Sequence, residues 1–291
     1  MKTIKFFSVA VALLFAPATF AADVETGYAA ENIVTVKASR VSKALVEAWA
    51  TAYMKVNPEV KIMVVGKQGR DADLSLVNAD ETSGEVTVVG RSAILPVTTV
   101  GNPLSAELRK RHWSKNDLRK LYFSSLEDEY AEDDEPIGGK LGKLRDKLTV
   151  YSSANAGGAS SVFATYFGYQ VSELRGNRIS GDDAFLINAI EDDKASITFN
   201  NVAYLYNTTT RTLKSELFIL PLNLKNDQQR VLQGGNLDET IKMLETEKTD
   251  LIPIVSFGFS YKAQKASAKQ FIDWVASEGQ AYNHQKGFLR K

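Results

Sequence analysis

The segment from Tyr151 to Phe163, Y-S-S-A-N-A-G-G-A-S-S-V-F, has the residue types of an anion-binding loop. An apolar strand ending near Val150 leads into small residues, and a helix carrying Phe167 follows. Adjacent glycines let a ligand approach the backbone, and the first helical turn leaves partly positive N–H groups unpaired. The segment therefore predicts an anion cradle at a helix N-terminus. An ordinary strand-to-helix turn would have a similar composition, so that interpretation stays open.

A second loop of this kind, Ser39-Arg40-Val41, lies between a strand predicted at residues 33–36 and a helix predicted at residues 43–56. A further strand at residues 60–65 completes a βαβ unit, in which ligands bind beyond the carboxyl ends of the strands. Arg40 is therefore placed to hold an oxyanion. A solvated surface arginine is the alternative interpretation of the same residue.

The composition describes a soluble chain of 291 residues with a substantial core and balanced charge, 35 basic against 35 acidic residues. This balance gives no indication of nucleic-acid binding or of an acidic membrane surface as a partner. The chain has no cysteine, which excludes disulfides, thiolate metal sites, cysteine nucleophiles and attachment of lipid to a cysteine.

Residues 1–21 have the features of a secretory signal peptide. Lys2 and Lys5 precede an apolar run at residues 4–15 that is too short to span a bilayer, and small residues end the segment at Ala21. Cleavage after Ala18 is a second possibility. We expect the mature protein to be exported to the periplasm.

Metal and catalytic chemistry find little support in the residue types. The acidic run at residues 127–135 lacks the spacing and central glycine of an EF-hand, so a solvated loop is the simpler interpretation than a calcium site. The two histidines, His112 and His284, do not combine with Ser39 or Ser92 into a nucleophile–base–orienter set. We expect neither an enzyme nor a bound cofactor or metal.

Three further elements are predicted from local patterns. Residues 86–89 form a strand that ends before Gly90-Arg91-Ser92, residues 113–123 form a helix with Ser114 as its N-cap, and residues 180–191 form a capped helix.

Two apolar runs that contain proline, at residues 94–100 and 251–257, separate the chain into two α/β parts. They resemble segments that cross between lobes, which predicts an α/β fold of two lobes with the second inserted into the first. The expected divisions are 22–97 with 251–291 for the first lobe and 98–250 for the second. A cleft between the lobes would bring together residues 39–41, 90–92 and 155–160, and such clefts are the usual ligand sites.

Short motifs along nearly all of the mature chain resemble the phosphate-binding proteins of phosphate ABC transporters, a branch of the type II periplasmic binding proteins. After the first strand–loop–helix, these motifs are N-P-E-V-K-I, L-P-V, L-R-K-L-Y-F, the Tyr151–Phe163 segment, A-S-I-T-F-N-N-V-A-Y, P-I-V-S-F and F-I-D-W-V-A-S-E-G-Q…K-G-F. Their order carries the resemblance. It implies a two-lobe type II periplasmic-binding-protein fold in a divergent member of the family.

The resemblance also implies ligand residues, which correspond one by one to this chain. The family's first loop, Ser-Thr followed by an apolar residue, corresponds to Ser39, Arg40 and Val41, and a second family position falls near Ser92, beside Arg91. The family's main loop reads Arg, small, Asp, any, Ser, Gly, Thr. Its counterparts here, aligned on Phe163, include Ser153 for Arg, Asn155 for Asp, Gly157 for Ser, Gly158 for Gly and Ala159 for Thr, with Ser160 following.

These replacements remove a guanidinium and two hydroxyls from the implied site. Each hydrogen bond to a charged group contributes about 1.5–3 kcal/mol, so the losses would weaken anion binding by orders of magnitude unless Arg40 or Arg91 restores charge. The resemblance implies a monomer that captures phosphate or a related oxyanion and delivers it to an ABC transporter permease. The alternative is a ligand-free interaction or adaptor protein of the cell envelope that retains the fold.

Overall fold

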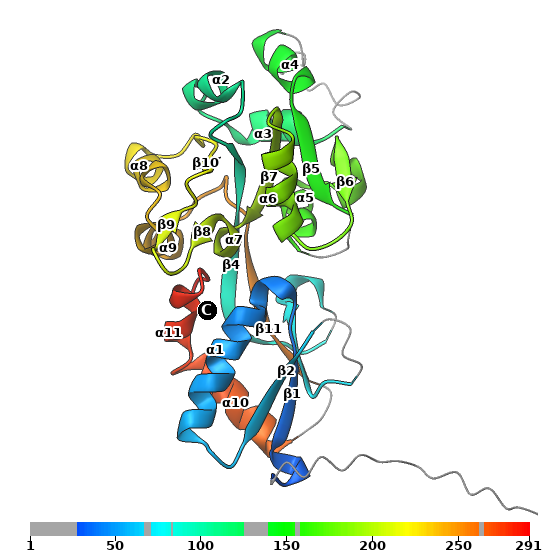
Figure 1. The fold of residues 1–291 in the computed structure, drawn as a ribbon, viewed down its shortest axis with the longest axis vertical. Coiled ribbons are helices and arrows are strands. Elements are labelled where there is room, and N and C mark those ends of the chain that lie inside the picture. Colours follow the sequence, from blue (N-terminus) through cyan, green and yellow to red (C-terminus); the bar gives the residue numbers. More distant parts are fainter. Residues whose placement is uncertain (1–27, 67–70, 83, 125–138, 155–157, 262–264) are drawn as a thin grey trace, which may run out of the picture.

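The computed structural model describes residues 28–66, 71–82, 84–124, 139–154, 158–261 and 265–291, which form a mixed α/β fold (Figure 1). Within these residues, nine strands form one sheet in the order β2-β1-β3-β11-β4-β7-β5-β6, with β10 paired to β4. Parallel and antiparallel pairs both occur, because βαβ units are combined with strands that return through the sheet. The α/β class predicted from the sequence is confirmed.

The first half of the fold is a βαβ unit extended by a third parallel strand. β1 (Ile33–Lys37) lies between β2 (Lys61–Val65) and β3 (Leu74–Asn78), and helix α1 (Arg40–Val56) connects β1 to β2. Helix α10 (Ala266–Ala276) contacts α1 and β1. The shared core of this half includes Val34, Leu45, Trp49, Tyr53, Leu74, Phe259, Phe271 and Val275. Burying these apolar side chains is the main force that holds the half together.

The second half is arranged around a long strand, β4 (Thr87–Thr99). β7 (Ser196–Asn201) and β10 (Leu217–Ile219) pair with it antiparallel. β5 (Thr149–Ser153) lies parallel to β7, and β6 (Asn177–Ile179) lies parallel to β5. Because β5 and β6 are parallel, the chain leaves both strands at the same edge of the sheet.

Helices complete the second half around a separate aromatic core. Those nearest the site are α5 (Ala159–Phe167) and α6 (Ala184–Asp192). The others are α2 (Ser105–Lys110), α3 (Lys115–Tyr122), α4 (Gly139–Asp146), α7 (Val202–Leu205), α8 (Asn226–Gly234) and α9 (Leu237–Thr246). In the core, the rings of Phe163 and Phe199 stack with centroids 4.1 Å apart. Such contacts add stabilisation beyond that from buried area.

Strands β4 and β11 (Ile254–Tyr261) connect the two halves, which Figure 1 shows stacked along the long axis of the molecule. In β4, Val89 packs in the core of the first half, whereas Leu95 and Val97 pack in that of the second. The chain then returns through β11 to the first half. Two lobes with the second inserted into the first are therefore confirmed as the architecture, while the divisions after residue 97 and before residue 251 stay predictions.

Three local expectations near the candidate site are wrong. The strands predicted on either side of residues 90–92 are one strand, because Arg91 and Ser92 pair with β11. Helix α1 begins at Arg40 rather than near residue 43, because Ser39 already has the extended conformation of an N-cap. Helix α6 begins at Ala184 rather than near residue 180, because Gly181 has a φ of 125°, outside the helical range.

Candidate functional site

The start of α1 points its free N–H groups out of the first half. Ser39 is the N-cap residue, but its side chain makes no capping hydrogen bond; its Oγ lies 2.9 Å from Oγ of Ser42. Arg40 and Val41 form the first helical turn. A helix of 17 residues carries about half a positive charge at this end, which favours an anion.

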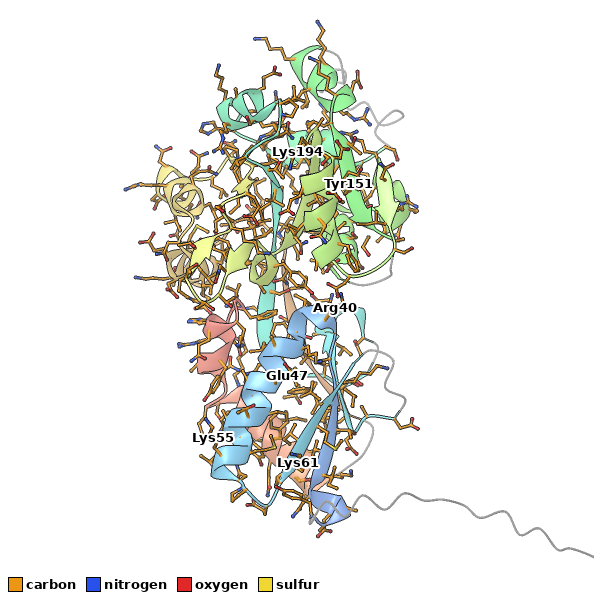
Figure 2. The ribbon with its side chains drawn as sticks, in the orientation of Figure 1. Arg40, Glu47, Lys55, Lys61, Tyr151 and Lys194 are labelled. Carbon is orange, nitrogen blue, oxygen red and sulfur yellow. The ribbon has the colours of Figure 1, made fainter. Side chains whose placement is uncertain are left out.

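Arg40 extends from α1 to the second half of the fold, and Figure 2 shows it at the end of α1 that faces that half. Its Nε lies 3.9 Å from Oδ2 of Asp182, and its guanidinium lies 5.7 Å from the ring centroid of Phe185. The Arg40 side chain is 64% exposed, so this ion pair contributes only about 0–1 kcal/mol. Arg40 can therefore exchange Asp182 for another anion at little cost.

The start of α5 is already bonded to a carboxylate from the chain itself. Asp183 Oδ2 accepts a hydrogen bond of 2.9 Å from the backbone N–H of Ala159. Gly158, the N-cap residue, has a φ of 77°, and a Cβ at this position would lie 2.8 Å from the same carboxylate oxygen. Glycine is therefore required here both for the left-handed conformation and for the close approach of Asp183.

Burial raises the pKa of Asp183 to about 6, and the negative charge of Asp182 adds to the effect, whereas the hydrogen bond from Ala159 opposes it. The neighbouring carboxylate of Asp182 accepts a 2.6 Å hydrogen bond from the Tyr204 hydroxyl. Burial and this carboxylate raise the pKa of Tyr204, so the phenol stays protonated and donates. The site therefore holds two adjacent carboxylates. Asp183 lies at the N-terminus of α5, and Asp182 lies beside Arg40, the first residue of α1.

Two of the four serines of the predicted cradle, Ser153 and Ser160, are buried and bonded within it. The N–H of Ser153 donates to Oγ of Ser160 at 2.8 Å, and Oγ of Ser153 donates to the carbonyl of Gly181 at 3.4 Å. These bonds fix the end of β5 against the start of α5 and against the segment that leads to Asp182. Asn155 and Gly157 lie outside the described residues.

Arg91 and Ser92 lie within β4, so they do not follow a strand end as predicted. Arg91 pairs through its backbone with Leu289, and its Nε donates to the carbonyl of Arg290 at 2.9 Å. Ser92 is buried. Of the two arginines proposed from the sequence, Arg40 is thus the one that contacts the second half, and Arg91 contacts the C-terminal segment.

Sequence reasoning missed Asp182, Asp183, Tyr204 and Phe185, which surround Arg40 and the start of α5. The predicted helix from residue 180 placed both aspartates inside a helix. A signal was present, because Gly-Asp-Asp directly before an apolar helical run is typical of a helix start. Recognising it would have placed two carboxylates at the edge of the sheet where the cradle was expected.

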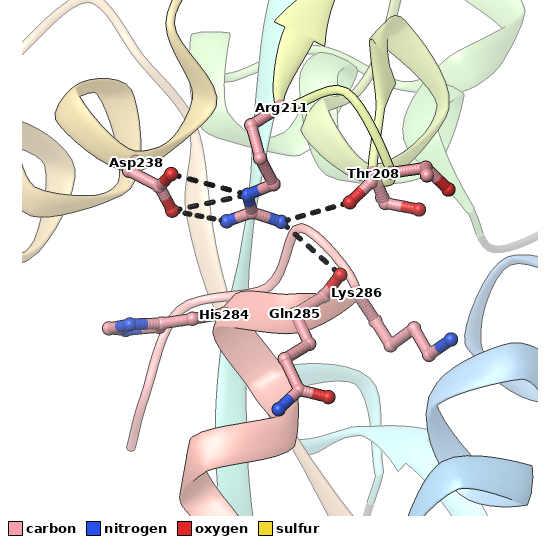
Figure 3. A pocket seen from close by; sticks show the side chains of 7 residues that line it. Thr208, Arg211, Asp238, His284, Gln285 and Lys286 are labelled. Atoms are coloured by element: carbon pink, nitrogen blue, oxygen red, sulfur yellow. Dashed lines mark hydrogen bonds and ion pairs between the residues drawn. The ribbon is translucent and has the colours of Figure 1, made fainter.

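A hollow lies beside α11 (Gln280–Gln285), between the two halves (Figure 3). It has a volume of about 410 Å³ and is lined by Thr208, Thr209, Arg211, Asp238, His284, Gln285 and Lys286. Arg211 donates to Asp238 at 2.5 Å through Nη2 and to the carbonyl of Gln285 at 3.2 Å through Nη1. The arginine is therefore engaged in linking the halves.

Neither a metal centre nor a membrane segment emerges from the part of the chain that the structure describes. No three histidine, aspartate or glutamate side chains there are grouped so that they could hold an ion. Among the helices of those residues, none combines the length and the apolar character needed to cross a bilayer. The acidic run at residues 127–135 lies outside the described residues.

The described residues have the two-lobe α/β fold that is found in periplasmic binding proteins. Solved structures with a similar fold include a protein assigned as a phosphate ABC transporter substrate-binding protein from Clostridium perfringens, with bound phosphate (15% identity, 89% of this chain and 100% of that chain, TM-score 0.60). An ABC-type phosphate transport receptor from Vibrio cholerae is 11% identical over 89% of this chain and 100% of that chain, with a TM-score of 0.56. PstS from Borrelia burgdorferi is 15% identical over 89% and 98%, with a TM-score of 0.50.

No protein-family model and no curated protein match the chain. At the identities of the solved structures, the similarity shows the fold alone. The resemblance to phosphate-binding proteins noted in the sequence is thus confirmed for the fold.

Proposed function

We propose that the chain is an exported solute-binding protein that captures phosphate or a related small oxyanion between its lobes for import by an ABC transporter. One observation carries the proposal. Arg40 at the start of α1 contacts Asp182, and the first amide of α5 contacts Asp183. Because these aspartates are neighbours in sequence, two helix N-termini from opposite lobes converge on one place.

The chemistry of this place suits an oxyanion. Helix N-termini supply N–H donors and partial positive charge, and an arginine supplies a planar fork that matches the oxygens of phosphate. The Ala159 N–H already donates to a carboxylate oxygen of Asp183, and Arg40 already pairs with the carboxylate of Asp182. These carboxylates are anions of the same chemical kind. A ligand would replace these carboxylates, and closure of the lobes would hold it, as in other hinged binding proteins.

The remaining parts of the proposal concern the route and the partners. Residues 1–21 would direct export and be removed, so that the mature protein acts in the periplasm as a monomer. Lobe 1 would comprise residues 22–97 and 251–291, and lobe 2 residues 98–250. A permease of an ABC transporter would receive the ligand from the closed form.

A second candidate function is a ligand-free interaction or adaptor protein of the cell envelope. It is favoured by the same aspartates, because Asp183 occupies the first amide of α5 and Asp182 engages Arg40. The hydroxyls of Ser153 and Ser160 are likewise used within the protein. In this alternative the chain's own carboxylates would fill the anion site permanently.

Calorimetry and thermal unfolding with phosphate, sulfate and molybdate distinguish the two functions. If a ligand binds, a concentration of 100 times Kd should add about 2.7 kcal/mol to the free energy of unfolding. Arg40→Ala should weaken binding by about tenfold or more, since one charge-assisted hydrogen bond is lost. Lys55→Ala, which removes an exposed charge from the far end of α1, is the matched control and should bind like wild type. Absence of binding by wild type with all three anions would favour the adaptor.

A further inference from the structure

We propose that Asp183 is a tethered competitor, whose carboxylate occupies the α5 N-terminus until an incoming oxyanion displaces it. Asp183 would then set the affinity of the site and its dependence on pH. This inference rests on the proposed function, because it concerns the same donors. It concerns a residue that the resemblance to phosphate-binding proteins does not place in the site.

The Asp183 carboxylate fits closely against the start of α5, at a position next to Gly158 and Ala159 that we call the seat. Ala159 donates to Oδ2 of Asp183 at 2.9 Å, and Gly158 leaves the space that a side chain would take. With a Cβ at residue 158, both carboxylate oxygens would lie within 3.2 Å of it. Asp183 therefore occupies the position next to the helix start where an oxygen of a bound anion would accept the same hydrogen bond.

The backbone that carries Asp183 is held by other groups, so its side chain can move alone. Asn200 donates through Nδ2 to the carbonyl of Asp183 at 2.6 Å. Asp182 is fixed by Tyr204 and by a 3.0 Å hydrogen bond from the N–H of Ala184. Rotation of the Asp183 side chain about its own bonds would free the Ala159 amide and leave these contacts in place.

The charges around Asp183 make its ionised form a weak occupant. Asp182 lies next to it, Tyr204 on α7 remains a neutral donor, and Arg40 on α1 pairs with Asp182. Among the residues that the structure describes, the Ala159 amide on α5 donates to the carboxylate of Asp183. Burial and Asp182 disfavour the negative charge of Asp183 and raise its pKa to about 6. An oxyanion that accepts hydrogen bonds from more donors can therefore displace the Asp183 carboxylate.

The sign of the pH dependence follows from this arrangement. Above about pH 6 Asp183 is charged, competes for the amide and repels the ligand. Below that pH it takes up a proton, and both effects weaken. Affinity for an anion should therefore rise as the pH falls through 6. Phosphate also gains a proton in this range, so the informative quantity is the ratio of affinities between two variants at one pH.

The experiment compares wild type, Asp183→Asn and the control Asp192→Asn by calorimetry with phosphate at pH 5 and pH 8. Asp192 is exposed at the end of the same helix, so its change alters charge but not the seat. Asp183→Asn should bind phosphate more tightly than wild type at pH 8, by between about tenfold and a hundredfold. The upper limit of about a hundredfold applies because pH 8 lies two units above the Asp183 pKa of about 6. The ratio should approach one at pH 5, and Asp192→Asn should match wild type at both.

Two results would separate failure of this inference from failure of the proposed function. If phosphate binds wild type and Asp183→Asn with equal affinity at both pH values, Asp183 does not compete, and oxyanion capture stands. If neither protein binds phosphate, sulfate or molybdate at either pH, oxyanion capture itself is rejected. Asp183→Ala, checked for folding by its thermal transition, repeats the comparison with the seat vacated.

Discussion

The carboxyl group of Asp183 lies in surroundings that oppose its own ionisation. Its pKa is about 6 in the folded protein against 3.8 for an ordinary aspartate. The folded state therefore binds a proton more readily than the unfolded chain, and the stabilisation from that proton is lost as the pH rises from about 4 through about 6. Strongly shifted pKa values cluster at functional sites, which accords with a role of Asp183 in ligand exchange.

We expect Asp183→Asn to be more stable than wild type at neutral pH and equal to it at pH 4. The amide is neutral throughout, so the difference in unfolding free energy should grow to about 2–3 kcal/mol at pH 7. Urea unfolding of both proteins at pH 4, 5, 6 and 7 measures it. Asp192→Asn, treated identically, should show no such growth. Parallel stability curves for wild type and Asp183→Asn would contradict the raised pKa.

Among the elements, those with strong local signals could be predicted from the sequence. The strand predicted at residues 33–36, the apolar stripe that became α1, and α3 after Ser114 all occur in the structure. β3 and β6 were missed, because their short sequences are polar or half-exposed and only pairing with β1 and β5 makes them strands. The four-residue error at the start of α6 had the largest effect, because it concealed both aspartates of the site.

Helix α3 shows how a capping motif that is visible in the sequence stabilises the folded protein. Ser114 accepts from the N–H of Asp117, and the Asp117 side chain accepts from the backbone N–H of Ser114, which forms a capping box. Burial would raise the pKa of Asp117, but hydrogen bonds from Arg111 and Ser114 outweigh it and hold this pKa below its ordinary value. The stabilisation is therefore present near neutral pH and is lost as the pH falls through the lowered pKa.

Ser114→Ala should accordingly lower the free energy of unfolding by about 1 kcal/mol at pH 7, since it removes the N-cap acceptor and one donor to Asp117. Guanidinium unfolding monitored by circular dichroism measures the loss. Ser172→Ala, at an exposed position of the same half, makes the same chemical change and should cost much less. A Ser114→Ala protein as stable as Ser172→Ala would show that the capping box contributes nothing.

At the scale of the whole molecule, polar contacts join the lobes on two sides of β4 and β11. Arg40 provides one side, and the cluster of Arg211, His284 and Glu245 provides the other; in Figure 1, α9 and α11 lie to the left of these strands and α5 and α6 to the right. The crossing strands could be predicted from their proline-containing runs. The contacts could not, because they join residues such as 211 and 285 that only the assembled fold brings together.

Arg211 carries most of the second set of contacts. Its guanidinium bonds Asp238 on α9 in the second half and the carbonyl of Gln285 at the end of α11 in the first. Its backbone has a φ of 60°, which is unfavourable for a residue with a side chain. His284 adds a contact of 2.8 Å between its Nε2 and Oε1 of Glu245. These contacts oppose any movement that separates α9 from α11.

We therefore expect Arg211→Ala to widen the range of distances between the lobes without unfolding either one. Because the native chain lacks cysteine, spin labels can be placed at Lys55→Cys and Lys194→Cys, exposed positions in opposite halves (Figure 2). Electron–electron double resonance should give a broader interlobe distribution for Arg211→Ala than for the parent. Arg211→Gly, which also relieves the unfavourable φ, should broaden it similarly, because both changes remove the guanidinium. Arg230→Ala removes an exposed arginine of α8 and should leave the distribution unchanged. If all four proteins give the same distribution, Arg211 does not restrain the movement of the lobes.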